Sequence, residues 1–505
     1  MSNAWTVTAR GGSWDGWWSG VLWALAAAGC GLALLYAAVK MPAHPWAMAG
    51  AVAGIAAALL LILHTPEWGG WICLLVVYWN ASNIIHDRLH FAWTLRALLI
   101  WSWLAWLLQR WLLHRARPMR WPLWRPLLAL LGVQALSTLF AAYPMAAAAS
   151  LFGLLKDIAF FYLIINLLSR PRDWQRGIWA LLAAGALMSV PVLFQRLSGS
   201  HFSFWGLAPQ KLAGLYGAQM GYRASGSLGD PNFFAMALSA LLPLAIAEGF
   251  ASHRWKLKLL AWSCFGIISG AVMLTYSRAS FLGIFFVGLI FLWHFRKHPA
   301  AWGIAVTGAL LLLLIAPARY WQRMISLQQV TGVATLNGLQ DPSLAARRNE
   351  IVIGWAMLLR HPLLGVGPGN YYLEFHRYEA RAGLLSQRHR HEVHNLFMEI
   401  LAETGLAGLA AFIYFLARLF GNLRSGLQRL QALQALHFAA LLWGMSASIA
   451  TYLFLSLFLH DAYFRHFFAL LTLAALAGQL IAEQSVNPVS AAPATLPAVA
   501  QAQPA

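Results

Sequence analysis

Long apolar runs recur along the chain and constrain its fold more than any other feature. Many span about 18 to 23 residues, and a helix of that length crosses the roughly 30 Å of hydrocarbon in a bilayer. A mean hydropathy of +0.62 and 26 tryptophans in 505 residues would leave large apolar patches on a water-soluble fold. The runs lack the alternating period of a membrane barrel. We therefore predict an all-α polytopic membrane protein with about 12 to 14 transmembrane helices.

The chain is strongly basic, with a formal net charge of +19 at pH 7. Such a charge could indicate nucleic acid binding, but basic residues of polytopic proteins gather in cytoplasmic loops and set orientation, so no nucleic-acid partner is predicted. The basic connectors, which fall on one predicted side, are 114–125, 169–176, 252–258, 296–298 and 418–429. The opposite, outer face then receives 198–231, 277–280, 318–394 and 459–462.

Changes in composition divide the chain into five predicted parts. These are N-terminal transmembrane helices (1–123), a central transmembrane region (124–317) with an outer loop (198–231), a long outer segment (318–394), C-terminal transmembrane helices (395–482) and a tail (483–505). The tail is rich in alanine and proline with almost no charge, which predicts disorder. The outer segment gathers titratable residues, and we expect the chemistry there.

Arginines are concentrated on the predicted outer face. The segment 318–394 carries nine arginines against five acidic residues. The positive-inside bias acts mainly on short loops, so a solvated surface is one reading of any single arginine. A phosphate or pyrophosphate site is the other reading, because the guanidinium group offers forked donors that match phosphate oxygens. A lipid-linked pyrophosphate would fit.

Two further stretches on the predicted outer face support the hypothesis of a phosphate site. Arg223 stands in "YRASGSLGDPNFF" before a small-residue turn and a helix start, and Arg278 stands in "TYSRAS" between two spans. Either arginine could instead snorkel at the membrane boundary. Arg347 and Arg348 are predicted to begin a short amphipathic helix over about 346–360. Arginines at three separate places on one face favour a phosphate site more strongly than any single arginine does.

Two other motifs exclude familiar sites. "HPLLGVGPGNYY" (361–372) does not match a nucleotide-binding glycine motif, so its glycines predict a tight turn. "HEVHN" (391–395) fails the H-E-x-x-H zinc pattern by one residue, and no protein-bound metal is predicted. The chain also contains no D-x-D, which removes the usual carboxylate pair for a nucleotide-sugar metal. We therefore expect a donor other than a nucleotide sugar, and no cofactor.

His394 is the candidate general base. It is predicted to be the last residue before a span, beside Asn395 as a potential N-cap, with Glu399 and Glu403 following at helical spacing. Histidine, with an unperturbed pKa of about 6.5, can accept a proton from a sugar hydroxyl near neutrality. The alternative is an interfacial histidine without a role in proton transfer.

These motifs together resemble the O-antigen ligase and polymerase superfamily of bacterial envelopes. The resemblance rests on "HPLLGVGPGNYY" followed by "HEVHNLFMEILAETG", with "RASGSLGDPNFFAM" and "TYSRASFLG" upstream, and covers roughly residues 130–470. It implies a GT-C-type membrane glycosyltransferase that acts at the periplasmic face of the inner membrane on an undecaprenyl-diphosphate-linked glycan, without an essential metal. The superfamily's important histidine falls on His394. Its arginines fall on Arg223, Arg278 and one of Arg347 or Arg348.

The resemblance leaves the acceptor open. A ligase transfers the glycan to lipid A-core, a polymerase adds it to another lipid-linked repeat, and a protein O-oligosaccharyltransferase gives it to serine or threonine. The chain shows one long outer segment and no added soluble module for protein acceptors, which favours the ligase. A lipid-linked glycan transporter is the alternative of another class, although its typical internal repeats are not evident. Asp461 is a further candidate that could meet the outer segment.

Overall fold

The computed structural model describes most of the chain. The described residues are 45–90, 94–111, 119–168, 170–216, 219–297, 299, 302–303, 342–382, 393–460 and 464–486. The predicted spans 18–39 and most of 299–317 lie outside these ranges.

The described part is an all-α bundle with one small hairpin. Its N-terminal helices are α2 (Pro45–His64), α3 (Glu67–Tyr78), α4 (Ala81–Leu89), α5 (Thr94–Trp111), α6 (Trp124–Leu139), α7 (Pro144–Leu167) and α8 (Pro171–Ser198). The central elements are β1 (Gln210–Tyr216), β2 (Gln219–Ala224), α9 (Pro231–Ser239), α10 (Leu242–Ala251), α11 (Trp255–Leu274) and α12 (Arg278–Phe295). The remaining helices are α16 (Pro342–Arg360), α17 (Tyr371–Arg381), α18 (Leu396–Ala432), α19 (Leu436–Leu455) and α20 (Phe464–Val486). Short 3-10 turns cover Phe204–Gly206 and Gly226–Leu228.

Eight helical stretches in the described ranges are long and apolar enough to cross a membrane, with α9 and α10 counted as one stretch. This confirms the predicted all-α polytopic membrane class. Proline at the first helical turn, where a missing N–H costs nothing, opens several of them, including α7, α8 and α9. The hairpin β1–β2, which lies inside the predicted outer loop, was not predicted.

Three predicted boundaries differ from the structure. The predicted span 68–85 is interrupted at Asn80, whose φ is 59°, so α3 and α4 are separate helices. The predicted span 232–250 is interrupted between α9 and α10, and Pro243 follows the interruption. The predicted connector 418–429 is helical, because α18 continues to Ala432 and buries Leu419, Leu423 and Leu430 along one face.

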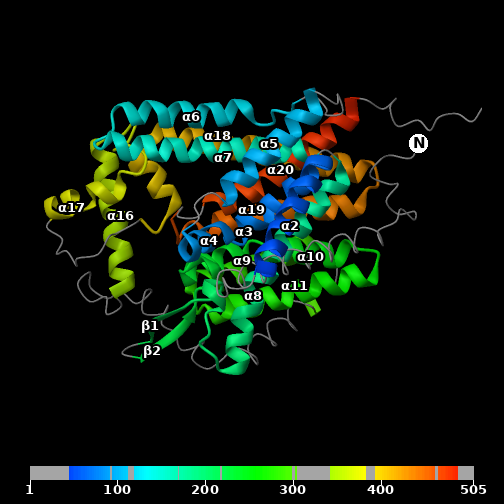
Figure 1. Ribbon diagram of the computed structural model, residues 1–505. Coiled ribbons are helices and arrows are strands. Elements are labelled where there is room, and N and C mark those ends of the chain that lie inside the picture. Colours follow the sequence, from blue (N-terminus) through cyan, green and yellow to red (C-terminus); the bar gives the residue numbers. More distant parts are fainter. Residues whose placement is uncertain are drawn as a thin grey trace, which may run out of the picture.

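The predicted outer segments gather at one end of the bundle. Figure 1 shows α16, α17 and the hairpin β1–β2 at the left end, while α6, α7 and α18 run away from them. A small core of Ile353, Met357, Tyr371, Met398 and Ala402 joins α16 and α17 to the start of α18. Helices α16 and α17 are therefore packed onto the bundle as a cap.

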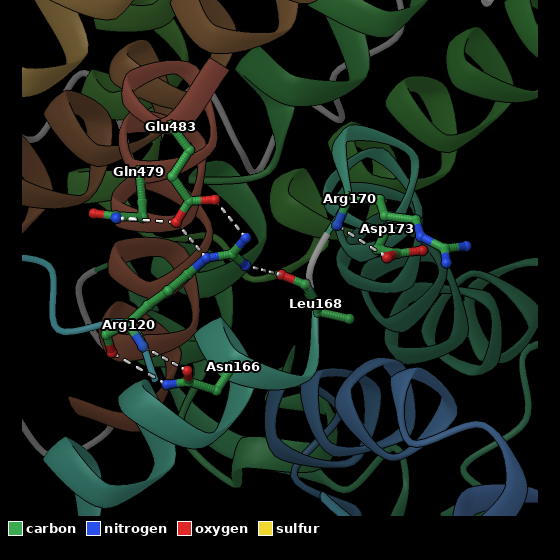
Figure 2. A network of polar contacts seen from close by, with 7 residues as sticks. All are labelled: Arg120, Asn166, Leu168, Arg170, Asp173, Gln479 and Glu483. Atoms are coloured by element: carbon green, nitrogen blue, oxygen red, sulfur yellow. Dashed lines mark hydrogen bonds and ion pairs between the residues drawn. The ribbon is translucent and has the colours of Figure 1, made fainter. Parts of the chain in front are cut away.

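A polar network fastens the other end of α6 and α7 (Figure 2). The guanidinium of Arg120 makes two hydrogen bonds of 2.6 Å to the carboxylate of Glu483. The backbone N–H of Arg120 donates to Asn166 Oδ1 at 2.7 Å. Because α20 extends to Val486, the predicted start of a disordered tail at residue 483 is wrong; the residues after 486 lie outside the described ranges.

Candidate functional site

The glycine-rich stretch 361–370 is a structural turn that lies against a kink in α18. Gly365, Gly367 and Gly369 have φ of 67°, 108° and 69°, a region that side chains disfavour. An added Cβ would collide with the backbone of Glu403, with Ala141 and with Ser150, respectively. The predicted tight turn is confirmed, and its glycines are explained by close approach to α7, to α18 and to the turn between α6 and α7.

Backbone pairing holds this turn to the kink. The N–H groups of Val366 and Gly367 donate to the carbonyls of Ala402 and Glu403, each at 2.9 Å. The kink itself is at Gly405, with φ 66° and ψ −163°. The buried carboxylate of Glu403 accepts the backbone N–H groups of Gly369 at 2.8 Å and Tyr371 at 3.1 Å. Glu403 therefore positions the start of α17 and has its oxygens occupied by the backbone.

His394 forms a hydrogen-bonded pair with Glu350 of α16. Its Nδ1 lies 2.9 Å from Glu350 Oε2, and its backbone N–H donates to the same oxygen at 3.2 Å. The Glu350 side chain is 2% exposed and that of His394 is 32% exposed, so the pair has a buried side and an open side. A carboxylate only accepts, so Nδ1 carries the proton, and in the neutral ring Nε2 keeps its lone pair. This is the arrangement of a histidine oriented to accept a proton at Nε2.

Tyr371 holds the backbone of Glu350 through a hydrogen bond. Its hydroxyl donates to the Glu350 backbone carbonyl at 2.6 Å. Burial, with Glu350, Glu399 and Glu403 nearby, raises the pKa of Tyr371, so the phenol remains a neutral donor. The predicted residue Glu399 therefore lies in this group of acidic side chains at the start of α18.

The predicted N-cap is confirmed. Asn395 Oδ1 accepts the N–H of Met398 at 3.0 Å, and Asn395 Nδ2 donates to the carbonyl of Leu457 at 3.0 Å. The backbone N–H of Leu396 donates to Ser456 at 2.9 Å. These bonds fix the first turn of α18 against the end of α19, and they fix His394 immediately before it.

Arg223 lies buried at the turn before α12. It extends from β2, is 7% exposed, and donates from Nε to the carbonyl of Thr275 at 2.8 Å. Its Nη2 donates to Asn232 Oδ1 at 3.0 Å. Asn232 belongs to the first turn of α9, which Asp230 caps. Arg278, half-buried, begins α12 three residues after Thr275, so the structure brings these two predicted arginines to one turn.

Ring contacts link the histidine to the arginine-bearing turn. The ring of His460 lies 5.5 Å from that of His394 and 4.8 Å from that of Phe233. Phe233 follows Asn232, which bonds Arg223. Contacts therefore run without interruption from the His394–Glu350 pair to Arg223.

The other predicted site residues are Arg347, Arg348 and Asp461. Helix α16 begins at Pro342, several residues before the predicted start, so Arg347 and Arg348 lie in its second turn. Arg347 is half-buried and Arg348 is exposed. Asp461 lies outside the described residues, although its neighbour His460 touches His394. Within the described ranges, no three histidine, cysteine or carboxylate side chains are arranged to hold a metal ion.

Glu350 was missed as a site residue because 44 positions separate it from His394. A signal for it exists in the sequence of α16. Glu350 precedes the buried residues Ile353 and Met357 by three and seven positions, which places a carboxylate on the apolar face of a helix. Such a carboxylate requires a partner, and His394 supplies it.

A family model described as O-antigen ligase matches residues 263–413. This match supports an assignment to the O-antigen ligase and polymerase superfamily. The matched family implies a membrane enzyme of the glycosyltransferase type, and the match confirms the resemblance inferred from the sequence motifs. The matched stretch contains Arg278, Glu350 and His394, whereas Arg223 lies before it. The search of curated proteins gives no match.

Proposed function

We propose that this superfamily member is an O-antigen ligase-like inverting glycosyltransferase. In this proposal it transfers a glycan from undecaprenyl diphosphate to a hydroxyl of lipid A-core at the periplasmic face of the bacterial inner membrane, without a metal. The observation that carries the proposal is the His394–Glu350 pair, connected through His460 and Phe233 to the turn that holds Arg223. The proposed proton acceptor and the proposed anion-binding group are thus linked by a continuous series of contacts.

The proposed reaction is a single displacement. The acceptor hydroxyl donates its proton to Nε2 of His394 as its oxygen attacks the anomeric carbon, and a new glycosidic C–O bond forms. The bond from that carbon to the diphosphate oxygen breaks, and its electron pair leaves with the diphosphate. Attack from the opposite face inverts the anomeric centre. Glu350 keeps the proton on Nδ1 and faces the imidazolium that forms.

The leaving diphosphate gains negative charge, which Arg223 and Arg278 are proposed to stabilise together with Arg347 or Arg348. Arg223 is the best positioned for this task, because hydrogen bonds to Thr275 and Asn232 already fix the plane of its guanidinium group in the absence of substrate. Its burial strengthens any attraction to phosphate relative to water. Arg347 is the better candidate of the adjoining pair, since it is half-buried while Arg348 is exposed.

The test uses purified protein in lipid with a defined undecaprenyl-diphosphate glycan. Lipid A-core and a second lipid-linked glycan are offered together, and products are identified by mass spectrometry. Core-attached glycan with inverted anomeric configuration supports the ligase proposal. Lengthened lipid-linked glycan would make the protein a polymerase, and transfer to an added serine-containing peptide would make it a protein O-oligosaccharyltransferase. Movement of the lipid-linked glycan across the bilayer without any transfer would favour a transporter.

A further inference from the structure

A polar cavity of about 210 Å³ lies on the face of the hairpin opposite Arg223. Strand residues alternate between faces, and β1 pairs with β2 so that Leu212 faces Tyr222 and Lys211 faces Arg223. Arg223 and Lys211 share the face toward α9, where Lys211 pairs with Asp230 at 3.5 Å. The other face lines the cavity, whose polar and aromatic walls include Gln195, Arg196, His201, Gln210, Tyr222 and Tyr276.

We propose that this cavity is a carbohydrate subsite that binds one pyranose ring of the glycan substrate. It is distinct from the transfer centre, by which we mean the region of His394, Glu350 and Arg223. The proposal deepens the proposed function and rests on it for the identity of the glycan. A cavity of this size is smaller than the roughly 300–1,000 Å³ of sites for larger ligands, which suits a single ring. A pyranose presents an apolar C–H face together with hydroxyl groups that both donate and accept.

The aromatic wall matches the apolar face of a sugar. Tyr222 is 54% exposed, and its ring lies 4.5 Å from the ring of His201 at an interplanar angle of 45°. An exposed tyrosine that another ring holds in place offers a flat apolar surface at little cost in conformational entropy.

The polar wall supplies both an acceptor and donors. Gln210 donates from Nε2 to Gln195 Oε1 at 3.1 Å, so its own oxygen accepts from His201 Nδ1 at 2.6 Å. His201 Nδ1 then carries the proton, and in the neutral ring its Nε2 is an acceptor for a hydroxyl. Gln195 is fixed in turn by bonds of 2.7 Å to two backbone carbonyls, those of Phe202 and Ala208. In the described part of the chain Arg196 makes no hydrogen bond, so its donors can serve a ligand.

Tyr276, in the cavity wall nearest Arg223, has a strained backbone conformation. Tyr276 has φ of 50°, in the left-handed region that a bulky side chain rarely adopts, and it is 7% exposed. It lies directly after Thr275, whose carbonyl binds Arg223. The strained residue therefore separates the cavity from the arginine by a single layer of backbone, and a sugar in the cavity would lie close to the transfer centre.

The test measures carbohydrate binding separately from transfer. Protein in lipid nanodiscs free of glycoside detergent is examined by saturation-transfer NMR with galactose, N-acetylglucosamine and galacturonic acid as probes. We expect saturation transfer to at least one sugar in wild type, about tenfold weaker binding in Tyr222→Ala, and near wild-type binding in Tyr222→Phe. Tyr143→Ala is the matched control, because Tyr143 is also exposed, at 44%, and lies at the start of α7. No signal from any probe, or equal binding in Tyr222→Ala, would overturn the subsite.

A kinetic arm identifies the source of the sugar. Tyr222→Ala should raise KM for the lipid-linked donor if the ring belongs to the donor glycan, and KM for the acceptor if it belongs to the acceptor, with kcat little changed in both cases. Unchanged KM for both substrates would refute a substrate subsite. Sugar binding that persists in wild type and in His394→Ala, while no transfer occurs in wild type, would refute the proposed function and leave the subsite standing.

Discussion

Glu350→Gln is the substitution that most sharply tests how His394 is used. It removes the charge of the carboxylate while keeping its shape. Two unit charges about 4 Å apart attract by about 1 kcal/mol in water and about 4 kcal/mol at an effective dielectric of 20. The Nδ1–Oε2 distance is 2.9 Å, and the partners are 2% and 32% exposed, so the pair lies between these limits with some solvent screening. At about 1.36 kcal/mol per tenfold in rate, we expect kcat to fall about 10- to 100-fold.

The assay is single-turnover glycan transfer, and a double-mutant cycle separates positioning from folding. If Glu350 acts through His394, Glu350→Gln should cost little further rate in a His394→Ala background. Glu374→Gln is the matched control, because Glu374 is also a buried glutamate, 3% exposed, in the same cap, and its ion pair is with Arg377. Wild-type kcat in Glu350→Gln, or fully additive losses in the double variant, would refute the reasoning.

Three further tests concern the turn and the arginines. Gly367→Ala should lower Tm and the yield of folded protein, because φ is 108° and the added Cβ meets Ala141 in the turn between α6 and α7. Gly132→Ala, with nothing within 4 Å of its Cβ, should not lower them, and equal melting curves would contradict this. Arg278→Lys should lose most transfer activity because the charge remains but the forked geometry is lost, and full activity would mean that Arg278 snorkels. Arg347→Ala should weaken donor binding more than Arg348→Ala, measured as KM for the lipid-linked donor, and the reverse order would assign the phosphate contact to Arg348.

Local signals in the sequence were sufficient for part of the site. Asn395 directly before an apolar run predicts an N-cap, and the cap is present because it depends on the next three residues alone. The spacing of glycines over 361–370 predicts a tight turn for the same reason. The partner of that turn, the kink at Gly405, was not predictable, since a glycine within an apolar helix does not reveal what packs against it.

Long-range pairing explains what the sequence did not reveal. Glu350 contacts His394 because α16 packs across the start of α18. No local pattern near His394 predicts which carboxylate will bind it. The hairpin β1–β2 lacks clear alternation of apolar and polar residues, because both of its faces carry polar side chains. Its pairing brings Arg223 onto one face and Tyr222 onto the other, a division that depends on register.

The rate of transfer in His394→Ala tests the central claim most directly. Wild-type and variant protein in lipid are loaded with the same undecaprenyl-diphosphate glycan, mixed with lipid A-core, and followed over a single turnover after donor binding has been shown to be equal. General-base catalysis is typically worth about 10² to 10⁴ in rate, so we predict a loss of that size with unchanged donor affinity. A variant that transfers glycan at the wild-type rate would contradict the proposed role of His394 and the mechanism built on it.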